Sequence, residues 1–182
     1  MRKIFVFLTS LFVSANAFAI DNEIEGDQQD HNYLIRTSLL SPIGGSYIVG
    51  IDRVLDELTT FGVTLGIHPK YDGTTLGMDV KHYIDGYSNQ SSFYFSYNTG
   101  LISASFAGED KDTHFVAKGY GHYLGASVGT KYTWDSGLAL LVGAGFDYVS
   151  MEMKVDAENR GVGFAQASGF TPTVDLTWAY QL

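Results

Sequence analysis

The feature that most constrains this fold is an alternation of apolar and polar residues with a period of two. In residues 61–68, Phe, Val, Leu and Ile lie on one face and Gly, Thr, Gly and His lie on the other. Side chains along a β-strand point to opposite faces in turn, so this period indicates strands rather than helices. The pattern recurs between turn residues and predicts eight strands. They lie within residues 32–41, 45–55, 61–68, 75–84, 93–101, 115–134, 137–148 and 173–182.

Two all-β architectures use alternating strands, and the polar face decides between them. A soluble sandwich exposes its polar face to water, whereas a membrane barrel turns its apolar face to lipid. Here the polar face is mostly Gly, Ser, Thr and Asn, which suit the narrow interior of a small barrel. We therefore expect an all-β fold, an eight-stranded antiparallel transmembrane β-barrel of the outer-membrane type. A soluble periplasmic β-sandwich is the alternative. The charged residues expected to pair inside the lumen are Arg36, Asp52, Asp79, Lys81, Lys131, Asp147 and Asp175.

The N-terminus has the layout of a secretory signal peptide. Two basic residues precede an apolar segment at residues 4–13, and Ala17 and Ala19 form a small-x-small cleavage site. The apolar segment is too short to span a membrane as a helix. The expected organisation is a signal peptide at residues 1–19, an acidic flexible tail at 20–31 and a barrel domain at 32–182.

The composition excludes several classes of protein. The 182 residues include no cysteine, which rules out disulfide scaffolds, zinc–thiolate sites and cysteine nucleophiles. The formal net charge of −9 argues against non-specific nucleic-acid binding, because nucleic-acid phosphates are themselves anionic. Only 17% of the residues are charged, whereas an ordinary soluble domain has about a quarter. That low charge fits strands with two largely dry faces.

Loop lengths and aromatic residues predict how the barrel is oriented, because outer-membrane barrels have short periplasmic turns, longer external loops and two aromatic girdles. The short periplasmic turns are expected at Asp56–Glu57, Asp85–Gln90 and Asp135–Ser136. The external connections are expected at Ser41–Gly44, His68–Gly73, Ala107–His114 and Glu152–Ser168. The girdles are expected from Tyr87, Trp134 and Trp178 at the inner rim, and from Tyr71, Phe106, Phe115 and Phe170 at the outer rim.

Candidate catalytic side chains are few and poorly placed. An odd offset puts two residues on opposite faces of a strand, so His122 with Ser127, and His82 with Asp79, are not expected to act together. A Ser–His–acid set assembled across strands remains open at this point. We predict no catalytic, cofactor-binding or metal-ligating residues, with His68 at the outer rim and His82 and His122 at interfacial or packed positions. The remaining histidines are His31 and His114.

Residues 108–114 concentrate acidic side chains and one histidine. Oxygen ligands at this density could hold a divalent cation. The spacing is not that of an EF-hand, and we favour the alternative of a solvated run of charges. A calcium or zinc titration that leaves the melting temperature unchanged would exclude a cation site in this segment.

The C-terminal segment resembles the terminal strand signal of bacterial outer-membrane β-barrels. Its alternating residues are Phe170, Pro172, Val174, Leu176, Trp178, Tyr180 and Leu182, with Leu182 in place of the usual terminal Phe. In that group the barrel-assembly machinery reads this segment. Residues 46–52 and 137–148 resemble the eight-stranded outer-membrane protein X and W-like families and small porin-like barrels.

Together these features predict export to the outer membrane of a Gram-negative bacterium. The implied partners are outer-membrane lipids and lipopolysaccharide, the barrel-assembly machinery through the C-terminal strand, and an extracellular partner bound through the loops. The implied role is that of a non-enzymatic barrel with a largely filled lumen, in surface interaction, adhesion or envelope integrity. A narrow porin-like channel is one alternative. A lipid A-modifying enzyme is a second, because some small outer-membrane barrels have that activity.

Overall fold

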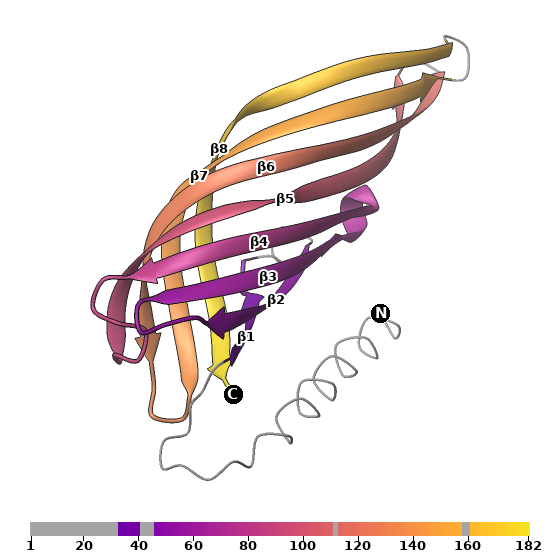
Figure 1. The fold of residues 1–182 in the computed structure, drawn as a ribbon. Coiled ribbons are helices and arrows are strands. Elements are labelled where there is room, and N and C mark those ends of the chain that lie inside the picture. Colours follow the sequence, from indigo (N-terminus) through magenta and orange to yellow (C-terminus); the bar gives the residue numbers. More distant parts are fainter. Residues whose placement is uncertain (1–32, 41–45, 111–112, 158–160) are drawn as a thin grey trace.

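The computed structural model describes residues 33–40, 46–110, 113–157 and 161–182 (Figure 1). Its strands are β1 (Tyr33–Ser38), β2 (Tyr47–Val54), β3 (Thr59–His68), β4 (Gly73–Tyr83), β5 (Ser91–Asp110), β6 (Thr113–Thr133), β7 (Leu138–Ala157) and β8 (Gly161–Gln181). Each strand is antiparallel to its neighbours, and β8 pairs with β1, so the sheet closes into a barrel. The predicted fold class is confirmed in strand number, strand direction and closure. Within the described ranges, no helix is long and apolar enough to cross a membrane.

The register of the strands sets the width of the barrel. One row of paired residues runs around the sheet from Gln181 through Leu34, Asp52, Gly62, Asp79, Asn98, Gly125 and Asp147 to Thr171. The row returns to β8 ten residues away from its start, and this offset is the shear of the barrel. For eight strands such a shear corresponds to a strand tilt of about 40°. A barrel of this size has room inside for side chains and little else.

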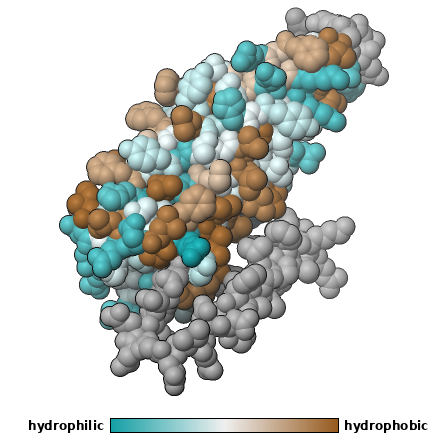
Figure 2. Space-filling model, in the orientation of Figure 1, coloured by the Kyte–Doolittle hydropathy of each residue, from teal (hydrophilic) through white to brown (hydrophobic). Residues whose placement is uncertain are grey.

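Alternate residues of each strand face the exterior and the lumen. On β4, Met78 and Val80 are exposed on the outside of the barrel, and Figure 2 shows apolar side chains spread over this surface. Their neighbours Asp79 and Lys81 are buried in the lumen. The predicted division into an apolar outer face and a polar inner face is therefore confirmed for this part of the barrel.

One end of the lumen is filled by a compact apolar cluster. The cluster lies at the end where β1 begins and β8 ends, close to the C-terminus in Figure 1. Its residues have little or no exposed surface, and Val54 packs against them. We call it the apolar plug, and its members are Leu34, Tyr83, Tyr87, Tyr94, Ala139, Leu141 and Ala179.

The three short turns lie where the sequence predicts them, at the plugged end. The β2–β3 turn is held by Asp56, whose carboxylate accepts a hydrogen bond from the Leu58 N–H at 2.8 Å. That bond lowers the pKa of the Asp56 carboxyl. Gly86 and Gly137, in the other two turns, have positive φ angles of 94° and 81°, which glycine adopts without steric cost. At the opposite end, the short η1 helix (Pro69–Tyr71) forms the predicted connection between β3 and β4, whereas Ser41–Gly44 lies outside the described residues.

The predicted external connections at Ala107–His114 and Glu152–Ser168 are right in position but wrong in length, because most of each segment is strand. β5 continues to Asp110 and β6 starts at Thr113, while β7 and β8 remain paired as far as Ala157 and Gly161. β5–β8 have 20 or 21 residues each, whereas β1–β4 have between 6 and 11. These four strands therefore project well beyond the closed ring (Figure 1). We call this extension the projecting sheet.

On β7 the projecting sheet keeps the alternation but reverses the face that is apolar. On β7, Met151 and Met153 lie on the side that continues the lumen, and Glu152 and Lys154 lie on the outer side. These outer residues of β7 have the composition of a polar loop, which hides the strand in the sequence, whereas β8 presents Val162 and Phe164 on the same outer face. The strand period persists, so the backbone stays in the ladder.

Shortening a plug residue should cost more stability than shortening its outward neighbour. Leu141 is 1% exposed and Val142 is 40% exposed on the same strand. We expect Leu141→Ala to lower the free energy of unfolding by about 3 kcal/mol, because it leaves a cavity in the plug. Val142→Ala should cost less than about 1 kcal/mol, because detergent fills the space outside. Urea unfolding in detergent micelles, followed by tryptophan fluorescence, measures both, and equal losses would contradict the assignment of faces.

Candidate functional site

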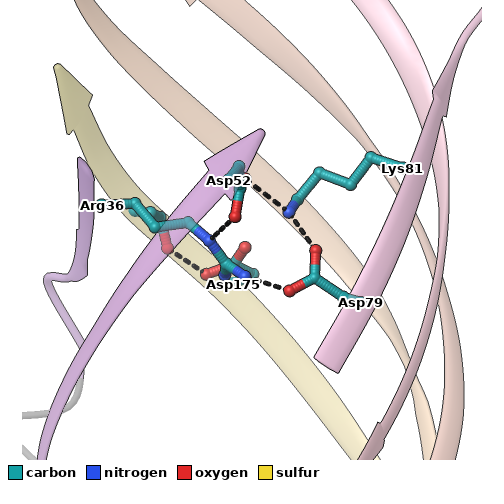
Figure 3. Close-up of polar contacts among 6 residues, drawn as sticks. Arg36, Asp52, Asp79, Lys81 and Asp175 are labelled. Carbon is teal, nitrogen blue, oxygen red and sulfur yellow. Dashed lines mark hydrogen bonds and ion pairs between the residues drawn. The ribbon is translucent and has the colours of Figure 1, made fainter. Parts of the chain in front are cut away.

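A ring of four charged side chains crosses the lumen next to the apolar plug (Figure 3). Arg36 donates from Nε to Asp52 at 2.6 Å and from a terminal nitrogen to Asp79. Lys81 donates from Nζ to Asp52 at 3.0 Å and also to Asp79. Each carboxylate oxygen thus accepts one charge-assisted hydrogen bond, and the four charges sum to zero. We call this group the ion-pair ring, and it confirms the predicted pairing for four of the lumen charges.

The register explains why these side chains meet. Asp52 and Asp79 stand in the same row on either side of Gly62. A side chain at Gly62 would collide with both carboxylates and with the Arg36 guanidinium. Lys81 lies two residues from Asp79 on β4 and therefore points into the same part of the lumen. Glycine at position 62 leaves the space that the ring occupies.

Lys131 is a buried cation outside the ring. Its ammonium donates to the backbone carbonyl of Tyr87 and lies 4.0 Å from the centre of the Tyr87 ring and 5.4 Å from that of Tyr83. Such contacts with aromatic faces stabilise a desolvated cation. The predicted pairing with a carboxylate is wrong for Lys131, because the Asp85–Gln90 turn folds Tyr87 under the barrel and provides the acceptor.

Two aspartates of the lumen also lie outside the ring. Asp147 accepts a hydrogen bond from Asn98 Nδ2 at 3.0 Å, and Asp175 accepts one from Thr177 Oγ1 at 2.5 Å. The carboxylate of Asp175 interacts electrostatically with the Arg36 guanidinium but is too far away to form an ion pair with it. Among the described residues, neither aspartate contacts a cation, so the predicted charge pairing is wrong for these two.

A cavity of about 330 Å³ lies beside the ion-pair ring. Ring residues line one side of it, and Asp147 and Asp175 also line it. It persists because β6 and β7 contribute small inward residues, such as Ser127 and Gly143, that do not reach across the lumen. Sequence reasoning missed three larger polar residues that line it, although the polar face of the alternation includes them. These residues are Tyr94, Asn98 and Tyr123.

The histidine and acid or serine pairs stand apart, as predicted. His122 is exposed on the outside of β6, whereas Ser127 lines the lumen cavity. His82 is exposed on the outside of β4, whereas Asp79 belongs to the ion-pair ring. The wall of the barrel therefore separates the members of each pair.

His68 lies at the end of β3 remote from the plug, as predicted for the outer rim. Its Nδ1 is 2.7 Å from Ser46 Oγ, and its Nε2 is 2.7 Å from Thr75 Oγ1. Both ring nitrogens are therefore occupied by hydroxyl partners. His114 is exposed near the start of β6, and His31 lies outside the described residues.

Three of the expected girdle residues lie on the outer face of the barrel. Trp134 and Trp178 are neighbours near the plugged end, with ring centroids 5.6 Å apart. Phe170 packs on Tyr148 at the level where the projecting sheet begins, with centroids 5.3 Å apart. These positions agree with the two predicted rims.

The other girdle assignments fail or fall outside the description. Tyr87 is buried in the apolar plug because its turn folds inward. Phe106 and Phe115 pack on each other, with centroids 6.2 Å apart, on the lumen side of the projecting sheet. They therefore do not form an outer-rim girdle. The side chain of Tyr71 is outside what the structure describes.

The acidic segment 108–114 falls at the end of the β5–β6 hairpin. Lys111 and Asp112, which it contains, lie outside the described residues. In the described part of the chain, no three His, Cys, Asp or Glu side chains are grouped to hold a metal ion.

The chain matches no protein-family model and no curated protein. Its candidate site is therefore defined by its own geometry, namely a neutral ion-pair ring beside a cavity that carries two further carboxylates.

Removing one charged side chain of the ion-pair ring should cost more stability than removing one cation together with one carboxylate. Lys81→Met leaves two carboxylates to share Arg36, and we expect it to lower the free energy of unfolding by about 3 kcal/mol. Lys81→Met combined with Asp79→Asn leaves a neutral pair of Arg36 and Asp52, and it should recover part of that loss. Lys118→Met, on the exposed outer face of the projecting sheet, is the control. Urea unfolding checks this, and additive losses in the double variant would show that the two residues do not interact.

Proposed function

We propose that this protein is a non-enzymatic outer-membrane β-barrel of a Gram-negative bacterium that acts in surface interaction or adhesion through its projecting sheet. The observation that carries the proposal is the length of β5–β8, which extend beyond the closed ring as a sheet with unpaired edges. Envelope integrity is the alternative role of the same fold. The N-terminal signal peptide and the resemblance of the C-terminal strand to the assembly signal also support this location.

A membrane location is supported by the height of the apolar outer surface. On β7 the outward residues from Leu138 to Tyr148 are apolar or aromatic throughout, as the alternation of that strand predicts. Ten residues of strand at a tilt of about 40° cover about 25 Å, the usual height of the lipid-facing band of an outer-membrane barrel. Trp134 and Trp178 lie at one border of this band, and Phe170 lies at the other.

A closed lumen is supported by the apolar plug and the ion-pair ring. The plug fills the end near the chain termini, and Lys131 is buried among its aromatic rings. The ring then joins β1, β2 and β4 and narrows the interior on that side. Passage of a solute would require the plug to open, which makes a permanent channel the less favoured alternative.

The projecting sheet offers backbone groups for recognition. β8 pairs with β1 only from Thr177 onward, and β5 pairs with β4 only up to Ser103. The parts of β5 and β8 beyond these points have no second neighbouring strand among the described residues. Beyond Phe170, the outer border of the lipid-facing band, such edges pair with extended segments of other proteins. Pro172 lies in the unpaired part of β8, where proline is tolerated because edge strands need fewer backbone donors.

Trimming the projecting sheet should abolish adhesion but preserve the barrel. We would join Ala104 to Gly119 and Met151 to Ala167, residues that already face each other, each through an Asn–Gly turn. Cells that make the trimmed variant should adhere several-fold less to an epithelial layer and to an abiotic surface. The matched control is the intact chain at equal abundance.

Folding of the trimmed variant is checked by outer-membrane fractionation and by a gel mobility that changes on heating. Equal adhesion of trimmed and intact chains would reject a surface role for the sheet. Sensitivity of the trimmed cells to detergent, without any loss of adhesion, would favour envelope integrity. Fractionation of the intact chain with soluble periplasmic proteins would contradict the membrane location itself.

The purified protein should give no steps of stable open current in a planar lipid bilayer. The reason is that the apolar plug closes one end of the lumen. Stable open steps would favour the narrow porin-like alternative, for which the cavity of about 330 Å³ is the specific supporting observation. The lipid A-modifying alternative would instead change the mass spectrum of lipid A in cells that make the protein.

A further inference from the structure

The inner face of the projecting sheet is apolar across its width. Three successive rows of paired residues on β5–β8 contain no polar side chain. On β7 and β8 these rows lie beyond Tyr148 and Phe170, the outer border of the lipid-facing band. With the membrane placed as proposed above, they face water and not lipid. We call this face the apolar shelf, and its rows are Ile102, Gly121, Met151 and Ala167, then Ala104, Gly119, Met153 and Ala165, and then Phe106, Ala117, Val155 and Gly163.

The two methionines cover one side of the apolar shelf and leave the other side open. A Cβ placed at Gly119 would lie 3.0 Å from Met151 Cε and 3.3 Å from Met153 Cγ, so both side chains lean toward β6. On β8, Ala165 and Ala167 are exposed. An exposed apolar face of this kind marks a binding surface, and methionine adapts to apolar ligands of varied shape.

The apolar shelf continues down into the cavity beside the ion-pair ring. Ile102 belongs both to the shelf and to the lining of the cavity, and Val149, two residues below Met151, lines the cavity as well. Asp147 points into the same cavity two residues below Val149. Its Oδ1 accepts a hydrogen bond from Asn98, and among the described residues no cation contacts the carboxylate. A partly exposed carboxylate therefore stands at the foot of an apolar face.

The charges of the cavity favour a cation at this carboxylate. The four charges of the ion-pair ring cancel, so Asp147 and Asp175 leave the lining with two uncompensated negative charges. Lys131 does not balance them, because its ammonium is held by Tyr87. Carboxylates between walls of low dielectric constant focus a negative potential that concentrates cations. Tyr123 lines the cavity one row above Asp147, and aromatic rings also attract cations.

The surroundings of Asp147 favour an organic cation over a metal ion. A metal ion needs several oxygen or nitrogen ligands around one point, and the apolar shelf offers none. A ligand with one positive charge and one apolar chain matches both parts of the surface at once. The distance along β7 from Asp147 to Met153 is six residues, which is about 20 Å of strand. The shelf therefore has room for a long chain.

We propose that Asp147 and the apolar shelf together bind a linear aliphatic ammonium, with the ammonium at Asp147 and the chain beside Met151 and Met153. The ammonium donates to the carboxylate, and the chain removes apolar surface of the shelf from water. The chain then points away from the cell, whereas the same amphiphile in the outer leaflet points its chain into the membrane. This inference rests on the proposed membrane location but not on adhesion, for which the edges of the sheet are proposed.

The test measures binding of alkylammonium ions to the full-length protein in nanodiscs of a zwitterionic phospholipid. Equilibrium dialysis fixes the free concentration of each probe, and binding to empty nanodiscs is subtracted. The probes are hexyl-, octyl- and decylammonium. We expect saturable binding of one probe per barrel, with an affinity that rises about two- to fourfold for each added methylene.

Two further compounds separate the roles of the charge and the chain. Ethylammonium has the same charge without a long chain, and octanesulfonate has the chain of octylammonium with the opposite charge. We expect no saturable binding of either compound. Binding of octanesulfonate as tight as that of octylammonium, or equal binding of ethylammonium, would overturn the proposal.

Two pairs of variants locate the site. Asp147→Asn should weaken the binding of octylammonium about tenfold or more, because it removes the counter-charge. Glu152→Gln, exposed on the outer face of the same strand, is its control. Ala167→Phe places a ring on the open side of the apolar shelf and should also weaken binding about tenfold. Ser168→Phe, the next residue on the outer face, is the control for that variant and should leave the affinity unchanged.

A gel mobility that changes on heating checks that each variant folds. If Asp147→Asn does not fold, the two phenylalanine variants decide, because positions 167 and 168 lie in the projecting sheet outside the closed ring. Equal affinities of the two members of either folded pair would overturn the proposal. Failure of the intact protein to enter nanodiscs would contradict the membrane location on which the site rests. Adhesion is measured on cells without any amine, so its loss or retention is a separate result.

Discussion

The closed ladder of eight strands with a shear of ten residues is the constraint on which the rest of this molecule depends. It fixes a narrow interior, so long inward side chains such as Arg36 and Tyr123 stand beside small residues in their own row. One such row places three glycines and a threonine between two large side chains. It contains Arg36, Gly50, Thr64, Gly77, Gly100 and Tyr123. The high glycine content follows from this geometry rather than from flexible segments.

The same constraint divides the lumen into two chemically different parts. Toward β1–β4, long charged side chains meet across Gly62 and neutralise one another. Toward β6–β8, the inward residues are small, and the carboxylates of Asp147 and Asp175 border open space. Charge balance is therefore local to one side of the barrel. A narrow interior brings opposite charges together only where the register places them within reach.

The sequence was sufficient to predict the number of strands, the inward and outward faces of the closed barrel and the short turns. All three depend on local period and turn chemistry. The separation of His122 from Ser127 followed from parity alone. The partners of Arg36 could not be predicted in this way. Its contact with Asp79 spans three strands and depends on the shear, which no local pattern encodes. Tyr87 was misplaced because its turn folds back under the barrel. The cavity was missed because it is defined by side chains that are too short to fill it.

The projecting sheet was missed for a different reason, which also locates its border. Leu124, Tyr148 and Phe170 form one row on the outside of the barrel, and His122, Ser150 and Ser168 form the next. The pairing is continuous across these rows, so a slipped register does not cause the change from apolar to polar. On β4 and β5 the second row still presents Leu76 and Leu101. A row climbs as it passes from β1 to β8, because it returns ten residues higher on β8. A border that runs level around the barrel must therefore pass from one row to another. The outward residues change from apolar to polar where such a border would cross these two rows. The change from apolar to polar outward residues therefore follows from what surrounds the barrel at each level and not from a change in its backbone.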